Sequence, residues 1–347
     1  MTTLQSLRER ASARGQSATR PAHTSAEEAR RRRRITVTLG ILAVLCLAGI
    51  IAYLTYDVRG SWDYAMDLRG RQVGSLVVVG AAVGASSLVF QTIAGSRILT
   101  PSVMGFDALY LLVQTIVVFF FGGTAFMMMG VGERFLLNTV VLTVFGLLLF
   151  RWLFGRNSRN LLVLVLVGIV IGSLFGSLTS LASRVLSPDD FLTLQDVMFA
   201  SFNTVDGALL WVAAAVCAVG VVALVPLLRY LDVVDLGHDN AVALGAPYHR
   251  VVTLTLAVVT VLVAVSTALV GPMLFLGLIV ANLARQIIPT HRHTELVLGS
   301  MLVGVLCTVG GQFVVGHLMD NGTTLSVVVN LVGGIYFILL LMRTVKL

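Results

Sequence analysis

The sequence contains little charge for its length. Asp, Glu, Lys and Arg together make up 12% of its 347 residues, whereas hydrophobic residues make up 57%. Soluble globular domains carry about 25% charged residues, so this chain does not have enough charge to cover a surface that faces water. A soluble protein is therefore excluded, and we expect lipid to surround most of the chain.

Lysine is almost absent, because Lys346 is the only one in the chain. The phosphate-binding loop of many ATPases, GxxxxGK followed by Ser or Thr, needs a glycine directly before its lysine, and Val345 precedes Lys346. If ATP drives this protein, a separate subunit must hydrolyse it. We therefore expect a chain that is not an enzyme and binds no cofactor of its own, with ATP and Mg²⁺ used by a partner ATPase.

Cysteine is also scarce. The chain has three cysteines, which are far apart and each lie inside an apolar run: Cys46, Cys217 and Cys307. Their spacing fits neither a disulfide framework nor a metal site. His291 and His293 form a His-x-His pair, but Glu295 is the one carboxylate close to them. We expect this pair to lie in a solvated loop, and we predict no metal site.

Positive charge is concentrated at the N-terminus. The formal net charge is +7, and Arg31 to Arg34 directly precede the first apolar run, which begins at Ile35. Residues 1–30 are polar and show no apolar periodicity, so we expect residues 1–34 to form a disordered cytoplasmic tail and residues 35–347 to form a transmembrane domain. Because the excess charge lies in this tail and in short loops, we expect lipid rather than nucleic acid as its partner.

Apolar runs recur along the rest of the chain, each long enough to cross a hydrocarbon core about 30 Å thick as a helix. We predict ten transmembrane helices, near residues 35–56, 72–95, 103–121, 134–154, 160–182, 207–229, 248–269, 271–288, 295–315 and 325–343. With the N-terminus inside, most arginines fall at cytoplasmic helix ends, in agreement with the positive-inside rule. The sequence therefore predicts an all-α, multi-pass cell-membrane protein with both termini in the cytoplasm.

Glycines recur at helical spacing in two of these spans, Gly80 and Gly84 in one and Gly168, Gly172 and Gly176 in the other. A spacing of four places them on one helix face and allows backbones to approach closely, so we expect both helices to be central in the bundle. We predict that helix 160–182 and one glutamine of helix 72–95 line a translocation pathway through these residues: Gly172, Ser173, Gly176, Ser177 and Gln91.

Charged residues are scarce inside the predicted spans. Asp107 is the charged residue that comes closest to the middle of a span. It lies in the first turn of its helix, where free backbone amides stabilise a carboxylate. Ion-coupled carriers usually need acids within the membrane. An ion-coupled secondary transporter is therefore a disfavoured alternative, and a membrane scaffold that transports nothing is a second one.

The longest predicted cytoplasmic loop between spans covers residues 231–249. Asp239 can cap a short helix that runs to about Leu244, Gly245 can end it in a left-handed conformation, and Pro247 prevents its continuation. A short helix under the membrane suits docking to a cytoplasmic partner. We predict that an ATPase couples to these residues of the loop: Asp235, Leu236, Gly237, His238, Asp239, Asn240, Ala243, Leu244, Gly245, Ala246, Pro247 and Tyr248.

The run 271–285, GPMLFLGLIVANLAR, resembles the signature GxIxFVGLIVPHxxR of permeases from iron-siderophore and cobalamin ABC importers. Residues 80–91, 97–105 and 235–245 are similar to further segments of that family, so the resemblance covers about residues 35 to 345. Ala281 and Asn282 replace the Pro-His of the signature. The chain keeps or substitutes signature residues at these positions: Gly271, Pro272, Phe275, Gly277, Asn282 and Arg285.

The resemblance implies the ten-helix bundle of a type II ABC importer permease, which pairs with an identical or homologous permease and with a cytoplasmic ATPase dimer. It also implies an extracytoplasmic binding protein whose acidic residues meet outer arginines, for which Arg69, Arg71 and Arg59 are the candidates. The departures from the signature resemble the branch that imports ferric siderophores in Gram-positive-type bacteria. Haem and cobalamin are alternative cargoes.

Overall fold

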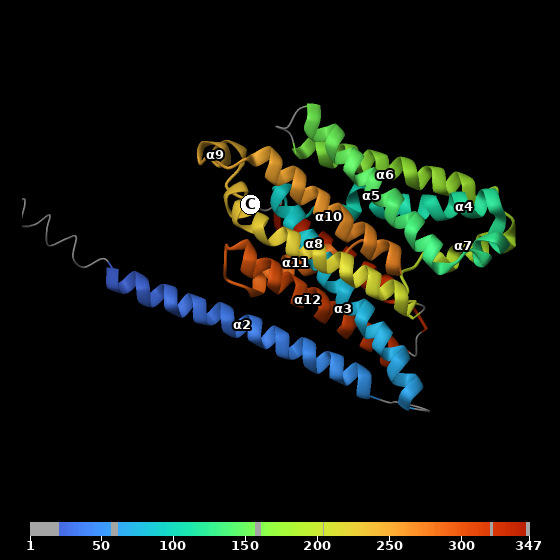
Figure 1. Ribbon diagram of the computed structural model, residues 1–347, viewed down its shortest axis with the longest axis horizontal. Helices are drawn as coiled ribbons and strands as arrows, with labels where there is room; N and C mark the ends of the chain where they lie inside the picture. The colour runs from blue at the N-terminus through green and yellow to red at the C-terminus, as the bar shows by residue number, and fades with distance from the viewer. Residues whose placement is uncertain (1–20, 57–61, 157–160, 204, 320–321, 345–347) are drawn as a thin grey trace, which may run out of the picture.

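The structure, a computed structural model, describes residues 21–56, 62–156, 161–203, 205–319 and 322–344, and in this part of the chain the regular structure is helical throughout (Figure 1). The helices are α2 (Pro21–Thr55), α3 (Trp62–Ile93), the short 3-10 helix η1 (Pro101–Met104), α4 (Phe106–Met128), α5 (Val131–Arg156), α6 (Leu161–Ser183), α7 (Pro188–Val197), α8 (Gly207–Val234), α9 (His238–Ala243), α10 (Tyr248–Val270), α11 (Leu276–Ile287), α12 (His293–Leu318) and α13 (Leu325–Thr344).

Nine of the described helices are long and apolar enough to cross a membrane, which confirms the predicted all-α, polytopic architecture. The prediction of a full span at 271–288 is wrong at its start. α11 begins only at Leu276 and has 12 residues, a length of about 18 Å that covers roughly half of a bilayer. Gly271 has a φ of 102°, and the chain from there to Phe275 is not helical, so Pro272 does not begin the helix.

α2 extends beyond the predicted start of the first span. It begins at Pro21 and has 35 residues, a length of about 50 Å, so residues 21–34 are helical where the sequence predicts a disordered tail. Ala, Glu and Arg dominate residues 26–34, and all three favour helix. The N-terminal part of α2 projects past the bundle (Figure 1). Residues 1–20 of the predicted tail lie outside the described residues.

α3 lies at the centre of the bundle, where it packs against α8, α10, α11 and α12. A Cβ added at Gly84 would lie 2.4 Å from the Ser300 carbonyl oxygen of α12, and one added at Gly80 would lie 2.8 Å from the Gly304 carbonyl oxygen. Two backbones approach this closely only where side chains are absent. The predicted central position is therefore confirmed for α3.

α6 lies at the edge of the bundle instead, where it packs on α4 and η1 (Figure 1). Gly168 and Gly172 meet Met104 and Gly105 there, but a Cβ added at Gly176 would have no atom within 4 Å. The prediction that this helix is central is therefore wrong for the described chain. Glycine spacing predicts a close approach, and for α6 that approach involves a short connecting segment rather than a second span.

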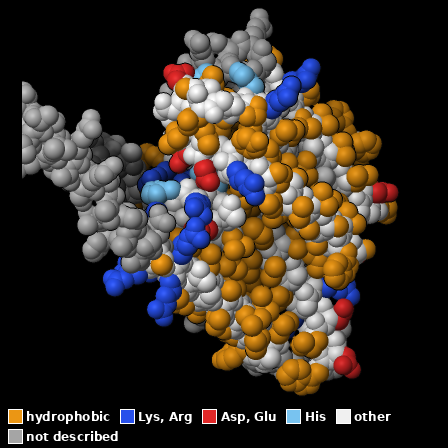
Figure 2. All heavy atoms as spheres, turned by 60° about the vertical axis from the view of Figure 1, so that its left-hand side comes forward, with side chains coloured by type: hydrophobic (Ala, Val, Ile, Leu, Met, Phe, Trp, Pro, Cys, Tyr) orange, Lys and Arg blue, Asp and Glu red, His pale blue; other side chains and the backbone are white. Residues whose placement is uncertain are grey.

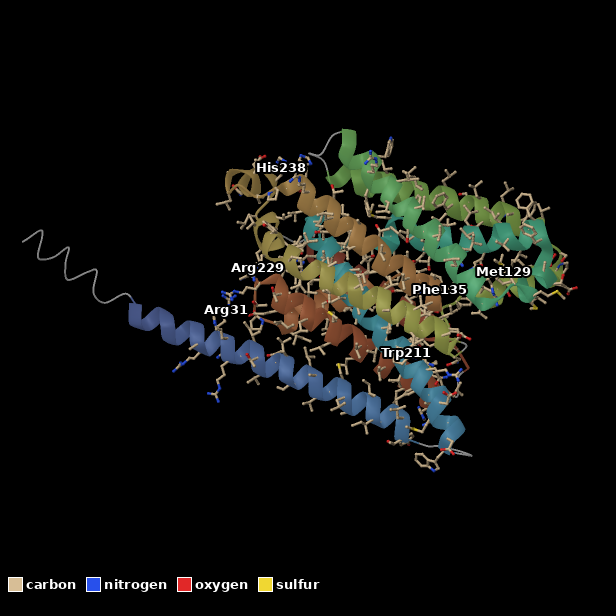
Figure 3. All side chains as sticks on the ribbon, in the orientation of Figure 1. Arg31, Met129, Phe135, Trp211, Arg229 and His238 are labelled. Atoms are coloured by element: carbon tan, nitrogen blue, oxygen red, sulfur yellow. The ribbon has the colours of Figure 1, made fainter. Side chains whose placement is uncertain are left out.

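The two ends of the bundle differ in charge. Arg31, Arg229 and His238 lie at the end that carries α9, whereas Met129 and Trp211 lie at the opposite end, near α7 (Figure 3). We call these the α9 end and the α7 end. Basic side chains gather around the α9 end, and beyond it the surface is largely hydrophobic (Figure 2), as lipid contact requires.

Candidate functional site

Two segments inside the bundle interrupt the helices. Between α3 and α4 the chain passes through an irregular stretch and η1, and between α10 and α11 it passes through residues 271–275. Non-helical backbone within a membrane is tolerated only where protein covers it or where it lines a cavity. Pro101 and Ser102 of the first break and Gly271 and Met273 of the second line one small cavity. The two breaks therefore meet and form one site.

A larger groove, of about 480 Å³, borders both breaks and lies between α6 and α13. Most of the side chains that line it are apolar, and Phe275 and Phe337 form part of its wall. Transporters place their pathways where helices are broken in this way. We therefore treat this groove as the candidate pathway.

Only some of the residues predicted to line a pathway lie at the groove. Gly172 and Ser173 line the groove. Ser177 is exposed further along α6, and Gly176 is half-buried there, but neither lines the groove. Gln91 is buried in α3, where its amide nitrogen and oxygen have no hydrogen-bond partner among the described residues.

Asp107 borders the groove from the first turn of α4. It is buried, and its carboxylate oxygens make no hydrogen bond within ordinary distance and angle limits, although the Ser102 hydroxyl lies beside it. Gly105 is the N-cap of α4, and no side chain caps the helix. The dipole of this helix start favours a carboxylate, but among the described residues no backbone amide donates a hydrogen bond to Asp107.

The signature residues set the packing of the second break. Gly271 supplies the positive φ at which α10 ends. A Cβ added at Gly277 would lie 2.0 Å from the Ser87 hydroxyl oxygen of α3, and one added at Gly333 of α13 would lie 2.2 Å from the Phe275 Cβ. These contacts hold α11 tightly between α3 and α13.

A chain of polar groups joins four helices at the α9 end. The Arg285 guanidinium of α11 donates a hydrogen bond to the Thr92 hydroxyl of α3 at 2.9 Å, and that hydroxyl lies 2.9 Å from Nε2 of His293 in α12. His293 Nδ1 and its backbone N–H each lie 2.7 Å from Oδ1 of Asp232 in α8. We call Arg285, Thr92, His293 and Asp232 the inner cluster.

The inner cluster corrects the expectation for His293. The sequence predicts that His291 and His293 share a solvated loop, but His293 is fully buried at the start of α12, and only His291 is exposed. The partners of His293 lie 201 and 61 residues away in the chain, so no local pattern could have indicated its burial. Within the described residues no group of three or more His, Cys, Asp or Glu side chains could hold a metal ion.

Asn282 adds a second link at the same end. Its side-chain amide donates a hydrogen bond to the Arg97 carbonyl oxygen at 2.8 Å, and Arg97 lies in the irregular segment between α3 and η1. The amide thus ties α11 to the break that borders the groove. Asn282 replaces the histidine of the family signature and, like histidine, can donate a hydrogen bond.

The loop between α8 and α10 carries α9, which projects from its end of the bundle (Figure 1). Gly237, with a φ of 95°, is the N-cap of α9, so the prediction that Asp239 caps this helix is wrong. Asp239 Oδ1 lies 2.9 Å from His238 Nδ1 instead. Gly245 has a φ of 79°, and its amide bonds back to the last turn of α9, so the predicted left-handed stop is confirmed.

Three apolar side chains of this loop face outward, with Leu236, Val242 and Leu244 being 57%, 51% and 67% exposed. They lie on a loop outside the membrane-spanning helices, so lipid contact does not account for their exposure. His238 packs edge-on against the buried Tyr248, with ring centroids 4.7 Å apart. The other predicted docking residues belong to the same unit: Asp235, Asn240, Ala243, Ala246 and Pro247. Clustered exposed apolar residues are typical of a protein–protein contact.

The arginines predicted to dock a binding protein have different surroundings. Arg69 Nη1 donates hydrogen bonds to three carbonyl oxygens at the end of α2, those of Tyr53, Leu54 and Tyr56. Arg71 forms an ion pair with Asp67, one turn earlier in α3, and its side chain is 47% exposed. Arg59 lies outside the described residues. Of the two arginines that the structure describes, Arg71 is the more accessible.

Sequence comparison relates the chain to known transport proteins. The model of the FecCD transport family matches residues 35–343. The petrobactin import system permease protein YclO of Bacillus subtilis is 42% identical over 317 residues, which cover 91% of this chain and 99% of that protein. The petrobactin import system permease protein FatC of Bacillus anthracis is 33% identical over 325 residues, which cover 93% of this chain and 92% of that protein.

A solved structure has the same arrangement of helices. A metal-chelate type ABC transporter in an inward-facing conformation aligns with a TM-score of 0.78 and 21% sequence identity, over 89% of this chain and 99% of its own. At this level of identity the likeness concerns the fold alone.

Proposed function

Because the chain belongs to the FecCD transport family and is the membrane permease subunit of an ABC importer, we propose that this importer takes up ferric siderophores. The proposed substrate is supported by the similarity to two Bacillus permeases of petrobactin import systems, which covers 91% and 93% of this chain. The proposed substrate is therefore ferric petrobactin or a chelate of similar chemistry. Haem and cobalamin are the alternative cargoes, and ion-coupled transport is the alternative mechanism.

The proposed orientation places the α9 end in the cytoplasm of the bacterial cell, with both chain termini on that side. Arginines support it, because those at the α9 end outnumber those at the α7 end and cytoplasmic ends of spans are the more basic ones. Besides Arg31, the described arginines at the α9 end include Arg97, Arg151, Arg229, Arg250, Arg285 and Arg292. The binding protein then docks at the α7 end, where Arg71, Arg69 and Arg59 are the proposed contacts.

In the proposed mechanism α9 docks into a partner ATPase through Leu236, Val242 and Leu244. ATP binding by the ATPase dimer displaces the docked loop, and α8 moves with it because it leads directly into α9. Asp232, near the end of α8, passes this movement to His293 and so to α3, α11 and α12. The groove opens or closes as these helices shift relative to one another.

A second permease, identical or homologous, is the proposed neighbour of α6 and α13. The groove between these two helices is open at the edge of the bundle, so a pathway closed on all sides needs a partner there. Apolar walls with few charged groups let a bulky chelate pass without tight binding. Specificity then rests mainly with the binding protein.

Leu244→Asp tests the coupling proposal. A carboxylate at the centre of an apolar contact should weaken ATPase binding about tenfold or more, while membrane insertion is unchanged because Leu244 is 67% exposed. Co-purification of the ATPase with the detergent-solubilised permease measures this. Val185→Asp, at a 69% exposed position near the α7 end, is the matched control and should keep the ATPase. Undiminished ATPase binding by the Leu244 variant would refute the assigned docking site.

Cargo and energy source are tested in liposomes that hold the permease pair and ATPase. Ferric petrobactin, haem and cobalamin are offered with the cognate binding protein, and uptake is followed with and without ATP inside. We expect ATP-dependent uptake of the ferric chelate alone. Uptake that continues without ATP and collapses with the ion gradient would show an ion-coupled carrier instead.

A further inference from the structure

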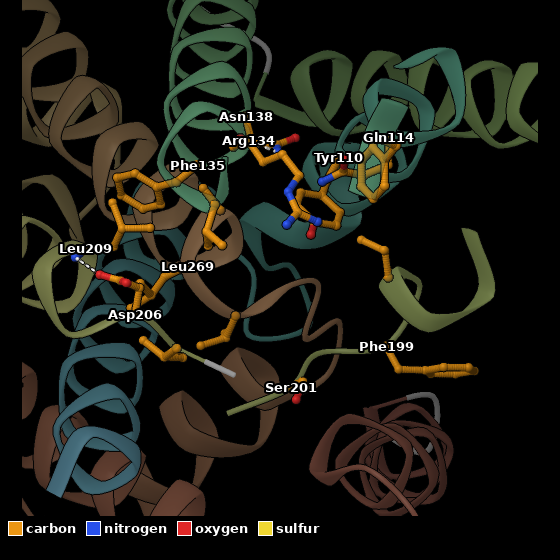
Figure 4. Close-up of a pocket in the computed structure, with 16 residues that line it drawn as sticks. Tyr110, Gln114, Arg134, Phe135, Asn138, Phe199, Ser201, Asp206, Leu209 and Leu269 are labelled. Carbon is orange, nitrogen blue, oxygen red and sulfur yellow. Dashed lines mark hydrogen bonds between the residues drawn. The ribbon is translucent and has the colours of Figure 1, made fainter. Parts of the chain in front are cut away.

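A cavity of about 330 Å³ lies near the α7 end, and Figure 4 shows the residues that line it. It shares no lining residue with the groove or with the inner cluster. α4, α5, α8, the end of α10 and the segment after α7 enclose it. One part of its wall is apolar, with Phe126, Phe135 and Leu269 among its residues, and another part carries Arg134, Asn138, Gln114 and Tyr110. None of these polar side chains has a role in the proposed transport mechanism.

Arg134 is the one cation among the residues that line this cavity. Its guanidinium lies 4.9 Å from the centroid of the Phe126 ring, and its buried Nε has no hydrogen-bond partner. No carboxylate of the described residues forms an ion pair with it. Arg134 is half-buried, and a charge that protein partly covers is stabilised by a paired anion, so an anion beside it would be favourable.

The acidic residues nearby already have other partners. Glu133 accepts a hydrogen bond from the Gly130 amide at 3.2 Å. Asp206, at the cavity wall, caps α8 by accepting from the amides of Ala208 and Leu209 at 2.8 and 3.3 Å. Neither carboxylate forms an ion pair with Arg134, so these two side chains do not supply its anion.

Asn138 lies one helical turn after Arg134 on α5 and is 1% exposed. Its Nδ2 donates to the Arg134 carbonyl oxygen at 2.7 Å, while its Oδ1 is buried without a partner. Gln114 and Tyr110 of α4 are also buried and line the same cavity. The cavity thus offers a planar cation, neutral hydrogen-bonding groups and one unused acceptor side by side.

We propose that this cavity binds an oxyanion, a phosphate or carboxylate group, through the Arg134 guanidinium. The planar fork of arginine matches the two oxygens of such a group, and Phe126 holds the guanidinium in place by stacking. A hydroxyl of the same ligand satisfies Asn138 Oδ1. The cavity lies near one membrane face, so the oxyanion comes either from an anionic lipid headgroup or from the aqueous phase.

The test measures thermal unfolding of the full chain in neutral detergent with added phosphatidylglycerol, phosphatidylcholine or inorganic phosphate. A rise in melting temperature with phosphatidylglycerol but not with inorganic phosphate identifies a lipid source. A rise with inorganic phosphate identifies a soluble one. If none of the three raises the melting temperature of the native chain, the proposal is overturned.

Arg134→Gln removes the charge and keeps a side chain of similar length, so the apparent affinity for the stabilising anion should fall about ten- to hundredfold, as expected on loss of a charged hydrogen bond. Arg184→Gln changes an exposed arginine at the same end of the bundle and should leave the affinity unchanged. Equal losses in both variants would show non-specific charge attraction and overturn the site.

Asn138→Asp keeps the proposal testable if Arg134→Gln does not fold. The new carboxylate lies four residues after Arg134 on the same helix face, within reach of an ion pair. We expect a higher melting temperature without added anion and no further rise when the anion is added. An anion response that survives in this variant would contradict the assignment, because a cavity that is already neutralised should not bind a second negative charge.

Discussion

α3 and α6 share the same spacing of glycines and lie in opposite surroundings. In an apolar stretch of 18 residues in α3, 72% of the residues are buried, against 11% in the corresponding stretch of α6. Gly84 of α3 meets the backbone of α12, whereas Gly176 of α6 meets no atom within 4 Å. Glycine spacing thus tells where a neighbour can approach closely and leaves open whether that neighbour belongs to the same chain.

Gly84→Leu should have the largest effect. An added Cβ would already lie 2.4 Å from the Ser300 carbonyl oxygen, and backbone cannot move aside as a side chain can. We expect a loss of about 3 kcal/mol or more, seen as aggregation or a strongly lowered melting temperature in detergent. Gly40→Leu on α2, where an added Cβ has nothing within 4 Å, is the control and should behave like the native chain. Equal stability of both variants would disprove the central packing of α3.

Thr92→Val acts at the C-terminal end of α3, about two turns after Gly84, and should have the second largest effect. The substitution keeps the shape but removes the hydroxyl that accepts from Arg285 and contacts His293. Leaving these buried polar groups without a partner should cost about 1–3 kcal/mol, measured as a lower melting temperature.

Thr92→Ser keeps the hydroxyl and is the control for this change. Because the inner cluster is also the proposed link between α9 and the groove, we expect Thr92→Val to reduce uptake per ATP hydrolysed as well. A variant that loses stability but keeps the native ratio of uptake to hydrolysis would leave the cluster with a structural role only.

The spans were predictable because each depends on a continuous apolar run, and local turn chemistry likewise predicted the left-handed stop at Gly245. The half-length of α11 was not predictable in the same way. A Gly-Pro pair is compatible with a helix start and with an extended break between helices. At Gly271 the chain packs closely beside Ala200, a residue distant in the sequence, and local patterns do not indicate this contact.

The burial of His293 and the surroundings of Arg134 could not be predicted from the sequence, and the physical reason is the same for both. His293 is buried by residues distant in the chain, so a pattern of neighbours indicated only a polar loop. Arg134 is the first residue of the predicted span 134–154, and arginines at the ends of spans are usually solvated. Its lack of a partner depends on four other elements that enclose it. Burial of a polar group is a property of the tertiary structure, and single-sequence patterns do not contain it.

Gly176→Leu on α6 should have the smallest effect on folding, with a change in unfolding free energy within about 0.5 kcal/mol, because an added Cβ would meet nothing within 4 Å. The isolated permease should therefore melt at the native temperature. If the open face of α6 is where a second permease packs, the same leucine should weaken pairing of the two subunits by about tenfold for each 1.4 kcal/mol of overpacking, measured by co-purification of tagged and untagged subunits.

Gly172→Leu completes the comparison, since its added Cβ would lie 3.0 Å from the Gly105 backbone and should disturb folding as well as pairing. If Gly176→Leu left both melting and pairing unchanged, the open face of α6 would face lipid, and the glycine row would serve only the contact with η1. If it lowered the melting temperature of the isolated permease, the face of α6 that carries Gly176 would have a neighbour within its own chain. Native folding together with weakened pairing in Gly176→Leu would show that the glycine row of α6 faces a second subunit, whereas that of α3 faces helices of its own chain.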